Sequence, residues 1–295
     1  MNGILLVDKP EGWTSHDVVG KLRSVLHEKR IGHSGTLDPM ATGLLVVFVG
    51  RATRAVEFAE ADSKEYLAGL RLGVSTDTQD TTGKVLSETD SIPTETELLH
   101  ILPEFTGTIS QLPPMYSAIK VNGKKLYELA RRGETVERKP REITIHALEL
   151  LYSDGRDSLL RVACSKGTYV RTLCHDIGSA LGCGGCMSRL RRTKAGTFSV
   201  DDAHTVDEIQ ALSDAGRISE ILLPVDRLFA GHDSLIVDPS EERKLRCGNV
   251  IKSRATDGKY RVYAESGEFL LLAEVQNGCL KTIKSFFEVT ENNNV

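Results

Sequence analysis

Cysteines are few and long hydrophobic runs are missing, and both features narrow the class of protein. The 295 residues include six cysteines, scattered without the spacing of a disulfide framework. The longest apolar runs, such as Leu44 to Val49, fall far short of the roughly 20 residues that span a bilayer. Only Ile4 to Val7 is apolar before Asp8, so no secretory signal peptide is expected. The sequence therefore predicts a soluble, cytoplasmic protein with reduced thiols and no membrane partner.

Length and composition set the number of domains. At about 100–200 residues per domain, 295 residues correspond to two domains. Apolar residues make up 40% of the chain, which is enough for packed cores. Composition changes near Leu222, and beyond Gly231 short alternating stretches between Gly-containing turns favour a small β-barrel. We predict a first domain over residues 1–230, a second over 231–291 and a disordered tail over 292–295.

Charge is distributed unevenly behind the formal net charge of −4. Met115 to Arg141 carries eight basic and three acidic residues, and Arg161 to Lys194 carries seven and one. Ser75 to Pro114 carries one basic and seven acidic residues. Two basic segments in a mildly acidic protein favour a polyanion on one face, and Gly and Tyr within both favour RNA. A solvated surface is the competing interpretation.

Local patterns predict an α+β domain. Thr94 and Thr205 each begin a capping box, Thr14 or Ser15 is a helix N-cap, and apolar residues then recur at helical spacing. Helices are also predicted for residues 52–60 and 168–181. Strands are predicted for residues 4–7, 44–49, 66–72, 143–152 and 159–164.

The stretch from Gly32 to Gly43 is the chemical centre of the sequence. Three glycines and a proline in twelve residues predict a structured loop. Pro39 pushes Asp38 toward extended geometry, so the loop would present the Asp38 carboxylate rigidly beside a buried strand. An isolated Asp-Pro pair is more simply a turn or a cap, and the wider string decides between these interpretations.

Residues 32–45, GHSGTLDPMATGLL, resemble the motif G-H-x-G-x-L-D-P-x-A-x-G-x-L of the TruB family of pseudouridine synthases. Four other segments resemble the family's motifs in order. They are LVDKPEGWTS at 6–15, KEY at 64–66, SKGTYVR at 165–171 and LRRT at 190–193 with Gly196 and Phe198. The five matches extend over about two thirds of the chain.

The resemblance implies a pseudouridine synthase fold with a mixed, largely antiparallel sheet and an active cleft across one face. The segment LRCGNVI at 245–251 is similar to a turn of PUA-type RNA-binding domains, which implies a PUA-like C-terminal domain. The implied activity isomerises uridine 55 in the T loop of tRNA to pseudouridine. The N1–C1′ bond breaks, the base rotates and C5 rejoins, which needs no cofactor and no metal. A monomer without protein partners would bind the tRNA T-arm.

The family's motifs imply a role for each matching residue. Asp38 would be the catalytic carboxylate, acting as a nucleophile on the sugar or base or as a base at C2′. Tyr66 would stack on the flipped uridine, and Arg171 would pair with Asp38. Lys9 would belong to the uridine pocket and support the site by packing its stem. The other implied residues are Tyr169 and Leu190 in the uridine pocket and His33, which would fill the space vacated in the RNA loop.

The basic segments would then contact RNA phosphates. Met115 to Lys125 lacks a helical pattern and is predicted to be a mobile insertion that clamps the substrate. One group of contacts would be Lys120, Lys124, Lys125, Arg131 and Arg132. A second group would form a wall of Lys166, Arg189, Arg191, Arg192 and Lys194. RNA affinity would therefore fall steeply with salt.

Other functions are weighed against this one. A non-catalytic tRNA chaperone would tolerate Asp38→Asn, and a synthase for a different RNA would share the motifs. A glycoside hydrolase needs two carboxylates, whereas the motif loop supplies one. Cys183 and Cys186 provide two of the four ligands of a structural zinc, and Cys174 and His175 could in principle add others, but free packing thiols are favoured.

Overall fold

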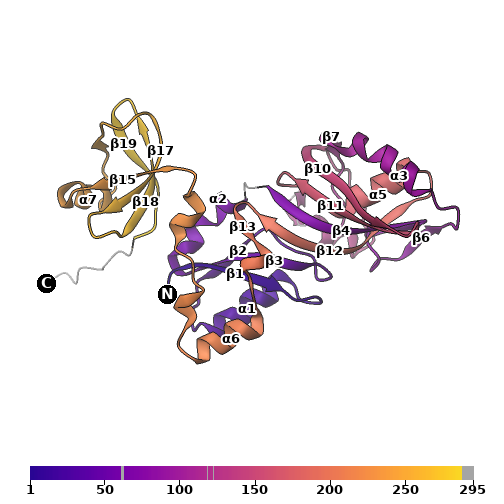
Figure 1. Ribbon diagram of the computed structural model, residues 1–295, viewed down its shortest axis with the longest axis horizontal. Helices are drawn as coiled ribbons and strands as arrows, with labels where there is room; N and C mark the ends of the chain where they lie inside the picture. The colour runs from indigo at the N-terminus through magenta and orange to yellow at the C-terminus, as the bar shows by residue number, and fades with distance from the viewer. Residues whose placement is uncertain (61–62, 118, 122, 288–295) are drawn as a thin grey trace.

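Two β-sheets organise the chain in the computed structural model, which describes residues 1–60, 63–117, 119–121 and 123–287 (Figure 1). The larger sheet takes its strands from residues 3–205, and the smaller sheet takes its strands from residues 233–285. The predicted tail over 292–295 lies outside the described residues.

The larger sheet is mixed and mostly antiparallel, as predicted. Its strands follow the order β14-β1-β3-β12-β4-β11-β10-β7, with β2 against β3 and β13 against β12. Only the β1–β14 and β3–β12 pairs are parallel in this sheet of the described chain. The strands are β1 (Gly3–Lys9), β2 (Ile31–Ser34), β3 (Thr42–Val49), β4 (Lys64–Leu72), β7 (Gly107–Gln111), β10 (Arg141–Ser153), β11 (Asp157–Cys164), β12 (Gly185–Ala195), β13 (Phe198–Ser199) and β14 (His204–Thr205).

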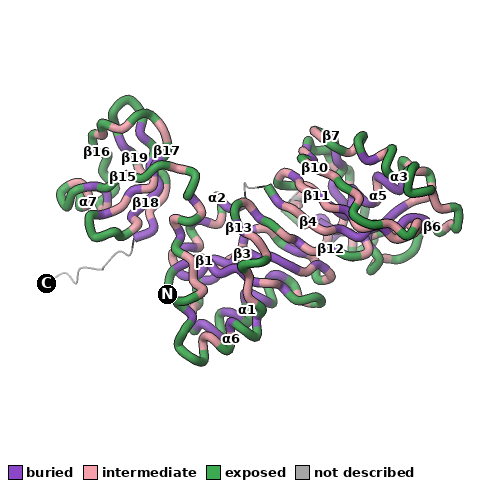
Figure 2. The backbone as a smooth tube through the Cα atoms, in the orientation of Figure 1, coloured by how far each residue is buried: buried purple, intermediate pink, exposed green. Residues whose placement is uncertain are grey.

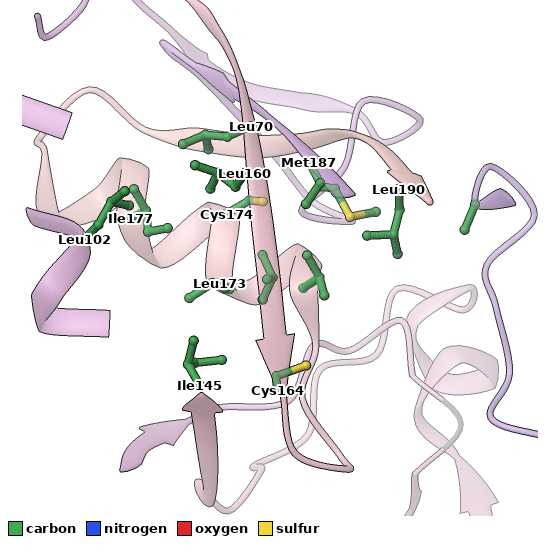
Figure 3. Close-up of a cluster of buried hydrophobic side chains, with 14 of the residues drawn as sticks. Leu70, Leu102, Ile145, Leu160, Cys164, Leu173, Cys174, Ile177, Met187 and Leu190 are labelled. Atoms are coloured by element: carbon green, nitrogen blue, oxygen red, sulfur yellow. The ribbon is translucent and has the colours of Figure 1, made fainter. Parts of the chain in front are cut away.

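Two groups of helices cover one face of this sheet, which we call the helical face. Helices α1 (Ser15–Val25) and α6 (Val206–Asp214) pack on β1 and β3, whereas α3 (Glu95–Ile101) and α5 (Val170–Ala180) pack around β4, β11 and β10. Figure 3 shows Leu173 and Ile177 of α5 within the apolar core that α5 forms with β4, β11 and β10. Lys9 on β1 and Arg192 on β12 are both paired with Gly43 on β3. Because cross-strand partners share a face, Lys9 and Arg192 lie on one face of the sheet. The two groups of helices therefore cover the same face. The loop between β2 and β3 lies between them.

The opposite face differs between its two halves. Over β1 and β3 it is apolar and covered by η1 (Gly50–Ala55), α2 (Val56–Glu60) and η5 (Val225–Phe229). Over β4, β11 and β10 it carries ion pairs, in which Arg161 contacts Glu65 and Glu149. Figure 2 shows the resulting contrast, with buried segments along β1 and β3.

Helix starts agree with the capping residues in the sequence. Thr14, Thr94 and Thr205 each accept a hydrogen bond from the third helical residue and complete a capping box. The predicted loop from Gly32 begins instead as strand β2. Strand β12 was not predicted, because basic side chains and two bulges interrupt its apolar alternation.

The predicted insertion, Met115 to Lys125, holds the short hairpin of β8 (Lys120–Val121) and β9 (Lys124–Lys125), and helix α4 (Leu126–Ala130) follows it directly. We call residues 115–132 the insertion. The buried side chains of Leu126 and Leu129 anchor this segment. The remaining small elements are the hairpin β5 (Val74–Thr76) and β6 (Val85–Glu88), together with η2 (Leu102–Phe105), η3 (Val200–Asp202) and η4 (Ile218–Glu220).

The smaller sheet is curled but open. Its order is β15-β17-β18-β19-β16, and no pairing between β15 and β16 closes it among the described residues. The elements are β15 (Asp233–Val237), α7 (Pro239–Arg246), β16 (Ile251–Lys252), β17 (Gly258–Ala264), β18 (Phe269–Gln276) and β19 (Cys279–Ser285). The predicted small β-barrel is therefore a curled half-barrel over the described residues, and this shape fits a PUA-like domain. Among the described residues, no helix has the length and hydropathy of a membrane span.

Phe229 joins the two sheets. It is 3% exposed, and its ring lies 5.3 Å from Phe58, 6.1 Å from Phe269 and 5.7 Å from Phe286, centroid to centroid. We expect Phe229→Ala to lower the free energy of unfolding by about 3–5 kcal/mol in denaturant titrations. Ile236→Ala is the control, because Ile236 is 73% exposed and its loss should change stability by about 0.5 kcal/mol or less. Equal effects of the two substitutions would contradict this packing.

Candidate active site

The loop that carries Asp38 is fixed by contacts with residues 9–15. Ser15 Oγ accepts a hydrogen bond from the Leu37 amide at 2.9 Å, and the Gly12 amide donates to the Pro39 carbonyl at 2.8 Å. Within the loop, the Ala41 amide donates to the Asp38 carbonyl at 3.0 Å. The start of α1 therefore sets the position of the Asp38 backbone.

Lys9 supports this loop through its amine rather than its stem. The side chain is fully buried, and Nζ donates to the carbonyl oxygens of Pro10 at 2.9 Å, Trp13 at 2.5 Å and Pro39 at 3.3 Å. Burial lowers the pKa of Lys9 to about 8. Lys9 consequently lies beneath the loop that carries Asp38, and its place in the uridine pocket stays a prediction.

Arg171 and Asp38 form the predicted ion pair, with 2.9 Å between Nε and Oδ2. The Arg171 side chain is 8% exposed, whereas that of Asp38 is 38% exposed. Arg171 also donates to the Thr78 carbonyl at 3.1 Å and the Tyr116 carbonyl at 2.8 Å. The guanidinium is thus held by three segments while the carboxylate keeps an accessible side.

The pKa of the Asp38 carboxyl is raised above its ordinary value. Burial is the largest cause and disfavours the charged form, while Arg171 opposes it. A second carboxylate, Asp80, also raises this pKa, and its Oδ2 lies 3.7 Å from Arg171 Nη1. The site is therefore a desolvated carboxylate that a guanidinium orients.

Asp80 is a site residue that the sequence interpretation missed. It is 4% exposed, and its Oδ1 accepts hydrogen bonds from Thr78 Oγ1 at 2.7 Å and Thr82 Oγ1 at 2.6 Å. The run TDTQDTT at 76–82 was the available signal, because alternating Thr and Asp form such local turns.

Tyr66 and Leu190 lie on the helical face near this ion pair. Tyr66 on β4 is opposite Arg192 on β12, and Leu190 is opposite Ala68, so all these side chains share one face. Tyr66 is half-buried and packs against the α5 core, which also contains Leu190. Burial raises the pKa of the Tyr66 phenol, so its hydroxyl is protonated at neutral pH.

Tyr169 marks the start of α5, where it is half-buried. Its backbone N–H and carbonyl both bond to the side chain of Gln111. Tyr169 lies two residues before Arg171, so these hydrogen bonds fix the start of the helix that carries the guanidinium.

Arg192 is not a phosphate contact. It is 1% exposed, and it donates to the Leu44 carbonyl at 2.7 Å and the Gly35 carbonyl at 3.0 Å. Its guanidinium thus braces both ends of the Asp38 loop from within the protein.

The predicted basic wall is also wrong as a single surface. Because side chains alternate along β12, Arg189 and Arg191 point to the face opposite Leu190 and Arg192. Arg191 is already paired there with Asp8, at 2.7 Å and 3.0 Å. Lys194 lies 3.8 Å from Glu65 on that face, whereas Lys166 is exposed in the turn before α5.

The insertion and β2 carry the remaining predicted contacts. Lys124, Arg131 and Arg132 are exposed. Lys125 and Arg131 each lie 5.4 Å from the centroid of the Tyr127 ring. Lys120 belongs to β8, and its side chain lies outside the described part of the structure.

His33 on β2 is half-buried, and burial lowers the pKa of its imidazole, with Arg192 as the next cause. Within the described residues its Nδ1 is buried without a hydrogen-bond partner. The ring is therefore neutral at pH 7.

The cysteines are free thiols. Cys174 and Cys186 are fully buried, and burial raises the pKa of Cys186 to about 11. In the parts of the chain that the structure describes, no three His, Cys, Asp or Glu side chains are grouped as metal ligands.

Comparisons with known proteins identify the family of this chain. The family model for the TruB family pseudouridylate synthase N-terminal domain matches residues 23–170, and that for the tRNA pseudouridylate synthase B C-terminal domain matches 171–230. The chain is 40% identical over 292 residues to tRNA pseudouridine synthase B of Clostridium kluyveri, covering 97% of this chain and 100% of that protein. Its identity to the same-named protein of Dechloromonas aromatica is 44%, covering 99% and 97%.

Solved structures share the fold. A chain of the Cbf5-Nop10-Gar1 complex superposes with a TM-score of 0.73 at 27% identity, over 97% of this chain and 85% of that one. The family match and the shared fold place the chain in the pseudouridine synthase class of RNA-modifying isomerases. Within that class, the chain belongs to the TruB family.

Arg192→Lys tests the bracing role of Arg192. A lysine keeps the charge but lacks the planar fork, so one of the two carbonyls loses its donor. We expect the free energy of unfolding to fall by about 1–3 kcal/mol and pseudouridine formation to slow, with tRNA affinity unchanged in filter binding. Arg189→Lys, on the opposite face, should leave all three unchanged. Weaker tRNA binding by the Arg192→Lys protein at unchanged stability would restore Arg192 as a phosphate contact.

Proposed function

We propose that this protein converts uridine 55 in the T loop of tRNA to pseudouridine, with Asp38 as the catalytic carboxylate. Membership of the TruB family supports isomerisation of a tRNA uridine. The observation that carries the role of Asp38 is its 2.9 Å ion pair with the buried Arg171 at the centre of the helical face. A desolvated, oriented carboxylate is what glycosidic bond cleavage requires of one side chain.

The reaction follows from this geometry. The target uridine leaves its stack and enters the site, where Tyr66 stacks on the base and Leu190 and Tyr169 line the pocket. The ionised Asp38 acts on the sugar or the base, and the N1–C1′ bond breaks. The base rotates and C5 bonds to C1′, which frees Asp38 where the carboxylate had attacked. The C5 proton leaves and N1 takes up a proton. Arg171 keeps Asp38 oriented throughout. No step of this scheme uses a cofactor or a metal.

RNA would approach across the segments that border Arg171. The insertion contacts Arg171 through Tyr116, and Lys166 lies in the turn that precedes α5. In this proposal phosphates bind Lys166 and the basic side chains of the insertion, while His33 fills the space left in the T loop. The insertion contacts are Lys120, Lys124, Lys125, Arg131 and Arg132.

The rest of the proposal concerns the whole chain. Residues 1–230 form the catalytic domain, and the curled sheet within 231–291 serves as a PUA-like RNA-binding domain. The chain acts as a monomer in the cytoplasm, with tRNA as its partner and without a protein subunit. Nop10 and Gar1 are subunits of the complex that contains Cbf5, and they are not part of this proposal.

Tritium release from tRNA tests the activity. Transcripts made with 5-tritiated uridine lose one tritium for each pseudouridine formed, because C5 exchanges its hydrogen for the C1′ bond. We expect one equivalent per tRNA from the wild-type protein, mapped to position 55. The isosteric Asp38→Asn protein should bind tRNA with unchanged affinity and release none, since an amide cannot serve as nucleophile or base. Tight tRNA binding without release by the wild-type protein would instead favour a tRNA chaperone.

A further inference from the structure

Gln111 has a buried side chain that the proposed mechanism does not use. It is the last residue of β7, 2% exposed, and far in sequence from α5. Its Oε1 accepts a hydrogen bond from the Tyr169 amide at 2.8 Å, and its Nε2 donates to the Tyr169 carbonyl at 3.1 Å. The side-chain oxygen and nitrogen of Gln111 thus both bind the backbone of Tyr169.

That residue begins the helix that carries Arg171. Tyr169 is the N-cap of α5, where Ser, Thr, Asp or Asn usually provides a side-chain acceptor. Tyr169 provides none, so its backbone is held from β7 instead. The Tyr169 carbonyl also accepts the Leu173 amide at 3.0 Å, which places Gln111 at the first turn of the helix.

The segment that follows Gln111 also contacts the Arg171 guanidinium directly. Five residues later, the Tyr116 carbonyl accepts a hydrogen bond from Arg171 Nη2 at 2.8 Å. Residues 111–116 therefore hold Arg171 at its tip and, through Tyr169, at its base. On the other side, Thr172 donates to Gln79 at 2.7 Å, next to the Thr78 carbonyl that Arg171 also contacts.

We propose that Gln111 is a positioning residue for pseudouridine formation, which sets the start of α5 so that Arg171 orients Asp38. This inference rests on the proposed role of Asp38. Gln111 touches neither reacting atom, and its effect passes through Tyr169 and Arg171. Small displacements of a catalytic group cost about 10²-fold in rate, so loss of the bridge should slow chemistry without weakening tRNA binding.

The test compares Gln111→Leu with the matched variant Gln210→Leu. Gln210 on α6 also makes two amide hydrogen bonds, to Asp214 at 2.8 Å and from Lys21 at 2.9 Å, but it lies away from α5. Single-turnover tritium release is measured at saturating enzyme, together with tRNA affinity and thermal unfolding. We expect Gln111→Leu to release tritium about 10²-fold more slowly at unchanged tRNA affinity, and Gln210→Leu to match the wild type.

Gln111→Glu adds a readout that simple destabilisation would not reproduce. A protonated carboxyl group can accept from the Tyr169 amide and donate to its carbonyl, as the glutamine amide does, whereas a carboxylate cannot donate. Burial raises the pKa of such a carboxyl group. The rate of this variant relative to wild type should therefore rise as pH falls from about 8 to about 6.

The outcomes separate this inference from the proposed function. Release by wild type but not by Asp38→Asn, with Gln111→Leu at the wild-type rate, would overturn the positioning role alone. The positioning role would also be overturned if lost folding or lost tRNA affinity explained the slow rate of Gln111→Leu, and if the rate of Gln111→Glu relative to wild type did not change with pH. Absence of release by the wild-type protein would overturn both.

Discussion

A carboxylate that is open to solvent on one side and a guanidinium that is almost fully buried meet at 2.9 Å on the helical face. The contact joins parts of the chain that are distant in sequence, because Asp38 follows β2 while Arg171 belongs to α5. Removing Arg171 would leave the carboxylates of Asp38 and Asp80 without this counter-charge, which is more costly than never forming the pairs. The surrounding structure is arranged to keep both groups in place.

Buried basic groups carry out this arrangement. Lys9 and Arg192 point into the protein beneath the Asp38 loop and donate to backbone carbonyls of that loop and its flanks. Arg171 donates to the Thr78 and Tyr116 carbonyls in addition to its carboxylate. A charged donor bonded to several carbonyls fixes loops more firmly than apolar packing alone, because each lost bond leaves a buried polar group unsatisfied. The rigidity of the Asp38 loop therefore depends on the burial of charged side chains.

Local signals made much of the fold predictable from the sequence. The capping boxes at Thr94 and Thr205 and the Pro39 loop rest on interactions within a few residues, and the structure contains all of them. The Asp38–Arg171 pair was accessible only through motifs whose spacing resembles a known family. Its 133-residue separation leaves no local trace in the sequence.

What the sequence did not predict depends on pairing and register. Consecutive arginines at 191 and 192 read as one basic cluster, yet strand alternation places one on each face of the sheet. β12 itself was missed for the same reason, since its bulges shift the alternation twice. Asp80 acquires its role only when the β5–β6 turn folds against α5, and barrel closure depends on whether two edge strands meet.

The most direct test of the central claim is the pH dependence of single-turnover tritium release by wild type and by Arg171→Met. Burial raises the pKa of Asp38 and Arg171 lowers it, so loss of Arg171 should raise this pKa further. In the proposed mechanism activity needs the ionised carboxylate, so it should fall as pH drops through that pKa. The acid limb of the profile should consequently move to higher pH in Arg171→Met, whereas Arg161→Met, which breaks a surface pair on the opposite face, should leave it in place. An acid limb that stays at the wild-type pH in Arg171→Met would contradict the account.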